Sequence, residues 1–184
     1  YLEVGRDADR KPAVLFLVDR SASMTIADKR DGAADAAAAQ RRRGRVPAKA
    51  PARDALLAGA LANPALDPVK ALSAKHQLEW YAFGQNNGAP PLPAADGEGA
   101  AKAPTLAAPA ETATQLGAAI ADAARRSKGR SADGIVILTD GGWNRGDDPV
   151  QAAKDAMERA GVPVFAVGIG VAAPKDLEVA WAFG

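Results

Sequence analysis

Two polar segments, each directly after an apolar run, hold the residues of this sequence best suited to chemistry. Asp19, Ser21 and Ser23 alternate after one such run. Asp140 follows another. If the chain stays extended after the first run, the alternating side chains project to one side, and a tight loop can wrap them around one ion. Hydroxyl and carboxylate oxygens are hard ligands, so this set favours Mg²⁺, Mn²⁺ or Ca²⁺ over zinc or copper.

The two aspartates are expected to converge at one edge of a sheet. In an open parallel sheet, ligands bind beyond the carboxyl ends of the strands, where the strand order reverses. Two unpaired carboxylates there would repel and desolvate each other, so Asp19 and Asp140 need a compensating positive charge. A divalent cation held directly by neutral serine hydroxyls, with the aspartates bonded mainly to its water shell, keeps much of its charge for an outside ligand. The pattern therefore favours a recognition site over a closed structural one.

Strands and helices alternate along the chain around these polar segments. Apolar runs that predict strands span residues 13–18, 78–83, 134–139 and 162–168. Stretches with helical spacing span residues 54–61, 66–76, 115–126 and 149–160. Three of the runs are nearly continuous in apolar residues, as expected for strands covered on both faces. The alternation predicts an α/β fold: a doubly wound, mostly parallel central sheet flanked by helices on both faces, of Rossmann-like type.

Two segments depart from this alternation. Residues 27–50 could form a solvated helix or a disordered insertion. Their basic run, residues 41–45, could bind phosphate groups, but a solvated charge run is the favoured interpretation. Residues 85–110 are rich in Gly, Pro and Ala, which predicts an irregular excursion with at most one short edge strand.

Composition narrows the classes of function. The chain has 184 residues with a net charge of +1, so it has the size of one domain and no global attraction to nucleic acid or anionic membrane. It has no cysteine, which excludes disulfides, thiolate zinc sites and cysteine nucleophiles, and a single histidine, His76, which disfavours histidine-based metal sites and Ser-His-Asp catalysis. No apolar run approaches the roughly 18 residues of a membrane span, so no direct membrane contact is expected of this segment.

The loop Asp19-x-Ser21-x-Ser23 resembles the metal-ion-dependent adhesion site (MIDAS) of the von Willebrand factor A (vWA) domain family. The family pattern adds a threonine from a second loop and an aspartate from a third. Thr114, which precedes a predicted helix, and Asp140 are similar to these two residues, and all five positions appear in the family's order. The resemblance implies bound magnesium, or manganese as a substitute, with a coordination position open to an acidic side chain.

The resemblance covers most of the chain, roughly residues 10–172. It implies a single vWA-like domain over 1–184. Thr112 is the alternative for the threonine ligand. Segments 141–146 and 161–170 resemble extracytoplasmic domains of bacterial membrane-anchored proteins, which implies that location. The start at Tyr1, rather than Met, and the apolar end suggest a piece of a longer protein that carries the anchors.

Residues beside the five candidate ligands are expected on the rim where a partner would dock. These are Arg20 and Met24, interleaved with the ligands, and Trp143, Asn144 and Arg145 after the third loop. Trp and Arg are common interface anchors. For Trp143, packing against a neighbouring helix is an equally good interpretation.

The sequence favours a binding module over an enzyme. The expected partner is an Asp or Glu side chain of another protein, or of a neighbouring domain of the same parent. The alternative is a Mg²⁺-dependent phosphatase or phosphotransferase with Asp19 as nucleophile. Enzymes of the haloacid dehalogenase type need a second acid two residues further on, and that position is Ser21. In a third alternative, the metal only ties the three loops together.

Overall fold

The computed structural model describes residues 11–29, 33–43, 51–86, 88–92 and 103–171. Within them, a single sheet contains strands β1 (Ala13–Asp19), β2 (Gln77–Phe83), β3 (Ala132–Thr139) and β4 (Val164–Gly168). The helices are η1 (Ala22–Thr25), α1 (Ala33–Arg43), α2 (Arg53–Leu61), α3 (Pro68–Ser73), α4 (Leu116–Ser127) and α5 (Pro149–Ala160). All four predicted strands and the four helices predicted by periodicity are present, with bounds shifted by a few residues.

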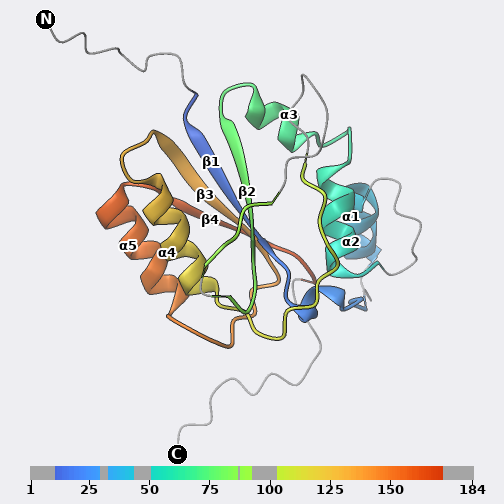
Figure 1. The fold of residues 1–184 in the computed structure, drawn as a ribbon. Helices are drawn as coiled ribbons and strands as arrows, with labels where there is room; N and C mark the ends of the chain where they lie inside the picture. Colours follow the sequence, from blue (N-terminus) through green and yellow to red (C-terminus); the bar gives the residue numbers. More distant parts are fainter. Residues whose placement is uncertain (1–10, 30–32, 44–50, 87, 93–102, 172–184) are drawn as a thin grey trace, which may run out of the picture.

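The strands of the sheet are parallel and lie in the order β2-β1-β3-β4. Helices α4 and α5 cover one face, and α1, α2 and α3 lie on the other (Figure 1). The predicted doubly wound α/β fold is confirmed. From β1 the chain first builds outward through β2 and then returns to β3 on the other side of β1, so the strand order reverses between β1 and β3. The carboxyl ends of these two strands carry Asp19 and Asp140.

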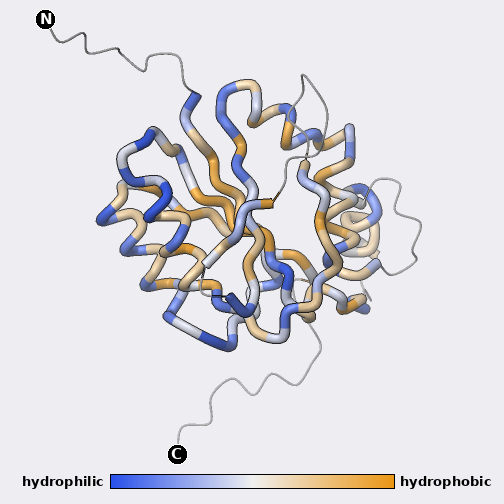
Figure 2. Tube along the Cα trace, in the orientation of Figure 1, coloured by the Kyte–Doolittle hydropathy of each residue, from blue (hydrophilic) through white to orange (hydrophobic). Residues whose placement is uncertain are grey.

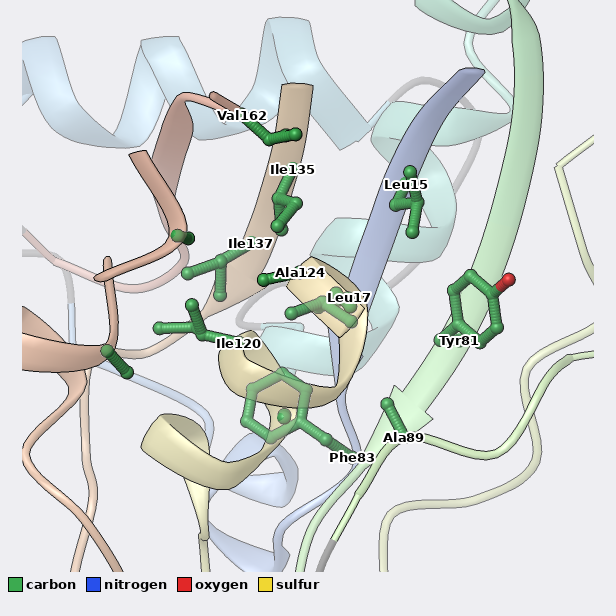
Figure 3. Packing of buried hydrophobic residues seen from close by; sticks show 14 of the residues in the cluster. Leu15, Leu17, Tyr81, Phe83, Ala89, Ile120, Ala124, Ile135, Ile137 and Val162 are labelled. Carbon is green, nitrogen blue, oxygen red and sulfur yellow. The ribbon is translucent and has the colours of Figure 1, made fainter. Parts of the chain in front are cut away.

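The near-continuous apolar character of β1 follows from its central position, because every residue of this strand is buried. One cluster, with Leu15 and Leu17, packs against α4 and α5 (Figure 3). The other packs under α2 and α3 and contains Phe16 and Trp80, whose rings stack with centroids 4.2 Å apart. Hydrophobic residues lie along the central strands, and hydrophilic residues lie in the loops and on the outer sides of the helices (Figure 2). The sheet is therefore held from both sides, which fixes where its strands end.

Helix α5 begins and ends where the sequence predicts. The side chain of Asp148 accepts a hydrogen bond from the backbone N–H of Val150, and Pro149 occupies the first turn. Gly161 ends the helix with φ of 67°, a left-handed conformation that glycine adopts without a Cβ penalty.

The two segments that depart from the alternation are partly described. Helix α1 forms within residues 27–50, which agrees with the solvated-helix alternative, whereas 30–32 and 44–50 lie outside the described residues. The described parts of 85–110 contain no strand. Pro91 forms an isolated antiparallel bridge with Tyr81 of the edge strand β2. None of the helices in the described part of the chain has both the length and the apolar character needed to span a membrane.

Ile135→Val tests the core around the central strands. Ile135 is fully buried in the cluster under α4 and α5, so losing one methylene should lower the free energy of unfolding by about 1 kcal/mol. Ile26→Val, at a residue that is 48% exposed, is the matched control and should change little. Chemical denaturation of both variants measures the difference, and equal effects would contradict the described packing.

Candidate functional site

Asp19 ends β1 as a buried carboxylate held by the two loops at the sheet edge. Its side chain accepts hydrogen bonds from the backbone N–H of Ser21 to Oδ1 (2.8 Å) and from Thr139 Oγ1 to Oδ2 (2.6 Å). Asp19 is 0% exposed. Thr139 Oγ1 in turn accepts from the N–H of Gly141 (3.1 Å). Thr139, which the sequence did not single out, thus joins the first and third loops.

The electrostatic environment of Asp19 favours a nearby cation. Burial raises the pKa of this carboxyl above its usual value, and the hydrogen bonds from Ser21 and Thr139 oppose that rise. The negative charge of Asp140 raises the pKa further, so the two carboxylates lie close enough to interact. A positive charge near Asp19 would oppose both effects.

The serines of the first loop present two oxygens side by side. Ser21 is buried and Ser23 half-buried, and their Oγ atoms are 2.9 Å apart. The loop turns at η1, where the N–H of Met24 donates to the carbonyl of Ser21 (3.0 Å). Ligands at right angles on a Mg²⁺ ion, each about 2.0–2.1 Å from it, lie about 2.9 Å from one another. The two hydroxyls form a hydrogen bond at this distance, and the same separation fits adjacent positions on such an ion.

The second loop is tied to the third by a reciprocal pair of hydrogen bonds. The N–H of Thr114 donates to Asn144 Oδ1 (2.9 Å), and the N–H of Asn144 donates to the carbonyl of Thr114 (3.3 Å). Thr114 is buried just before α4, whereas Thr112 is exposed and its hydroxyl donates to Gln85 Oε1 (3.2 Å). This geometry favours Thr114 over Thr112 as the candidate ligand.

Sequence reasoning missed Arg53, which lies at the start of α2 and places its guanidinium at the site. Its Nη1 lies 2.7 Å from Asp140 Oδ2 and also donates to the carbonyl of Ser23 (3.4 Å). Its Nη2 and Nε donate to the two carboxyl oxygens of Asp28 (2.7 and 3.0 Å). The side chains of Asp28 and Asp140 are 7% and 4% exposed. The pKa of Arg53 is raised, first by the hydrogen bonds to Asp28, so this cation is firmly charged.

The predicted rim residues divide into two groups. Trp143 is 46% exposed, and Asn144 and Arg145 are also exposed, so the segment after the third loop lies on the surface. Met24 and Arg20 do not lie on the rim, which corrects the expectation for both. Met24 is fully buried in the cluster under α2 and α3, and Arg20 is 6% exposed. Alternation does not explain these positions, because Ala22 between them is exposed; Met24 turns inward within η1.

The donor set suits a hard dication. Among the described residues, no group of three or more His, Cys, Asp or Glu side chains could hold a metal ion. A site here would instead combine two carboxylates with neutral hydroxyls, and the Asp19, Ser21 and Ser23 geometry above agrees with such a set. Arg53 already neutralises part of the negative charge of Asp140. The remaining protein oxygens would leave an ion here with coordination positions open.

One comparison with known proteins, a family model, supports a vWA domain. The family model of the von Willebrand factor type A domain matches residues 103–180, which include the second and third loops. A search of the curated proteins gives no match. Among solved structures, the chain is similar to proximal thread matrix protein 1 from the mussel byssus, with 17% identity and a TM-score of 0.49. That similarity covers 87% of this chain and 38% of the mussel chain.

The four-stranded parallel sheet with helices is consistent with the Rossmann-like vWA architecture, and the family match supports a vWA domain. Domains of this family are typically protein-interaction modules and are generally non-enzymatic.

Proposed function

We propose that this chain is a metal-dependent protein-binding module that recognises an acidic group of a partner protein or neighbouring domain. The observation that carries the proposal is the pair of serine hydroxyls, 2.9 Å apart, beside the buried carboxylate of Asp19 at the edge where the strand order reverses. Protein oxygens gathered at this edge are expected where an α/β fold binds a ligand.

In this proposal the ion is held by hydroxyls rather than by charge. Ser21, Ser23 and Thr114 would be direct ligands, while Asp19 and Asp140 would accept hydrogen bonds from its water shell. Mg²⁺ is the proposed ion, with Mn²⁺ or Ca²⁺ as substitutes. When bound, it supplies positive charge for the Asp or Glu carboxylate of the partner. Trp143, Asn144 and Arg145 supply exposed surface beside that position.

One observation favours binding over phosphoryl transfer. The position of the required second acid is Ser21, whose hydroxyl lies against Ser23. A generic phosphatase substrate tests this alternative: metal-dependent turnover that is lost in Asp19→Asn would replace the proposal with an enzyme. An extracytoplasmic place in a bacterial membrane-anchored parent remains part of the proposal.

Magnesium titration of chelator-treated protein tests the metal site. An ion present at about 100 times its dissociation constant should add about 2.7 kcal/mol to the free energy of unfolding, seen as a rise in Tm. Asp19→Ala and Asp140→Ala should lose this response. Asp133→Ala is the control, because that side chain is 52% exposed and lies at the opposite end of β3. Equal responses in all four proteins would exclude the site.

Partner binding is a separate measurement. A peptide with a single exposed Glu should bind the Mg²⁺-loaded protein weakly and lose binding on chelation, whereas its Gln counterpart should not bind. If the metal stabilises the protein but neither this peptide nor the other domains of the parent bind in a metal-dependent way, the metal only ties the loops together.

A further inference from the structure

A polar depression of about 390 Å³ adjoins the candidate ion site at the carboxyl edge of the sheet. Three loops line it, after β2, before α4 and after β3, with the residues Gln85, Asn86, Gln115, Arg145 and Gly146. The hydrogen bonds between Thr114 and Asn144 join the second of these loops to the third. Because Gln115 follows Thr114 and Arg145 follows Asn144, the depression lies directly beside the candidate ligand Thr114.

The floor of this depression is built by the buried side chain of Gln115. Gln115 is 6% exposed, and its Nε2 donates to the backbone carbonyl of Gln85. Gly146 packs against it so closely that a Cβ atom at Gly146 would lie 3.2 Å from Gln115 Oε1. Gly146 has φ of 82°, a conformation that glycine adopts without a steric cost. Gln115 therefore holds the two flanking loops in place around the depression.

The accessible groups around this floor are mainly hydrogen-bond donors. Arg145 is exposed, and within the described part of the chain its guanidinium forms no hydrogen bond or ion pair. The hydroxyl of Thr112 donates to Gln85 Oε1 (3.2 Å), which leaves the NH₂ group of Gln85 without a partner among the described residues. Asn86 is exposed next to Gln85. The guanidinium and the side-chain amides can therefore donate to a ligand from outside.

The charge of the depression selects the class of ligand. Among the described residues that line it, Arg145 alone is charged. The acids that follow in the chain, Asp147 and Asp148, line the groove between α4 and α5 instead. A positive lining favours an anion, and the planar guanidinium can donate two parallel hydrogen bonds to one carboxylate. The neighbouring amides add donors for the same group.

We propose that this depression binds a second carboxylate of the partner whose first carboxylate reaches the metal. The proposal rests on the proposed function, because the first carboxylate positions the second. The partner is then a protein segment with two acidic side chains, and Arg145 determines specificity for the second one.

Two kinds of peptide test the proposal by NMR titration of the ¹⁵N-labelled, Mg²⁺-loaded protein. One kind has a single Glu between glycines, and the other has a second Glu one to four residues away on either side, roughly 3–14 Å along an extended chain. Either Glu of the second kind can reach the metal, which alone gives a twofold gain in affinity. An exposed ion pair adds up to about fivefold, so the best two-Glu peptide should bind about tenfold more tightly than the single-Glu peptide. Replacing its second Glu by Gln should remove this gain.

Two variants assign the gain to Arg145. Arg145→Met, with its fold verified by the amide spectrum, should reduce the gain to the statistical factor of two. Arg159→Met is the matched control, because Arg159 is 73% exposed at the far end of α5 and its loss removes the same charge. The control should keep the tenfold gain. A tenfold gain that persists in Arg145→Met, or is lost equally in both variants, would contradict the assignment.

Failure of this proposal is distinguishable from failure of the proposed function. If the single-Glu peptide binds only with Mg²⁺ present and no two-Glu peptide gains more than twofold, the depression does not bind a second carboxylate and the proposed function stands. If the single-Glu peptide does not bind the Mg²⁺-loaded protein at all, both are overturned.

Discussion

Arg53→Met should lower the free energy of unfolding by about 3 kcal/mol in metal-free protein. Arg53 is the cation that faces both Asp28 and Asp140, whose side chains are 7% and 4% exposed. Removing one partner of a buried ion pair costs about 3–5 kcal/mol because the other charge stays buried and unpaired. The lower end applies because the Arg53 side chain is 17% exposed. Urea denaturation in the presence of a chelator measures the loss.

Magnesium should restore part of this stability. In the proposed site, the ion and Arg53 both neutralise Asp140, so the variant should gain more from Mg²⁺ than the wild type gains. Arg130→Met is the control for loss of an arginine ion pair, since Arg130 is 39% exposed and its pair with Glu79 is worth little. If Arg53→Met and the wild type gain equally from Mg²⁺, Arg53 and the ion do not share Asp140.

Sequence reasoning found the first loop of the candidate site but missed Arg53. The first loop was visible because its ligands alternate over five residues after a strand, a local pattern. Arg53 and Asp140 are 87 residues apart, and no spacing rule joins them. Their contact depends on where α2 begins relative to the third loop, which only tertiary packing determines.

The fold was more predictable than the site for a related reason. The four strands and α5 carry their signals in neighbouring residues: continuous apolar runs, Asp148 as N-cap and Gly161 as terminator. The buried positions of Arg20 and Met24 were not predictable, because burial in this loop follows tertiary contacts and not the alternation: Asp19 and Ser21 are buried too, and Ala22 is exposed. A polar sequence around a loop shows that the loop is exposed on average, but does not show which of its side chains is exposed.

Thr139 illustrates how one residue of the sheet organises the candidate ligands. Its hydroxyl donates to Asp19 and accepts from Gly141, so the end of β3 fixes both the carboxylate of the first loop and the start of the third. The first loop therefore supplies the carboxylate of Asp19, and the neighbouring strand helps to fix its orientation.

Gly117→Ala should have a comparably large effect, for a steric reason. Gly117 is buried in the first turn of α4, and a Cβ atom there would lie 2.2 Å from the backbone oxygen of Asp147 and 2.8 Å from its carbonyl carbon. In an ordinary helix, Gly to Ala stabilises by about 1 kcal/mol. Here the backbone leading to α5 has to move, so we expect a net loss of about 3 kcal/mol, near the upper end for overpacking.

The same change should weaken the candidate metal site, because Gly117 lies between its second and third loops. Moving the backbone at Asp147 away from α4 would stretch the hydrogen bonds that join Thr114 to Asn144. The affinity for Mg²⁺ should therefore fall along with stability. Gly168→Ala is the control, since a Cβ at that position meets nothing within 4 Å. A Gly117→Ala protein as stable as the wild type would mean that α4 and the third loop are not in the close contact on which this arrangement depends.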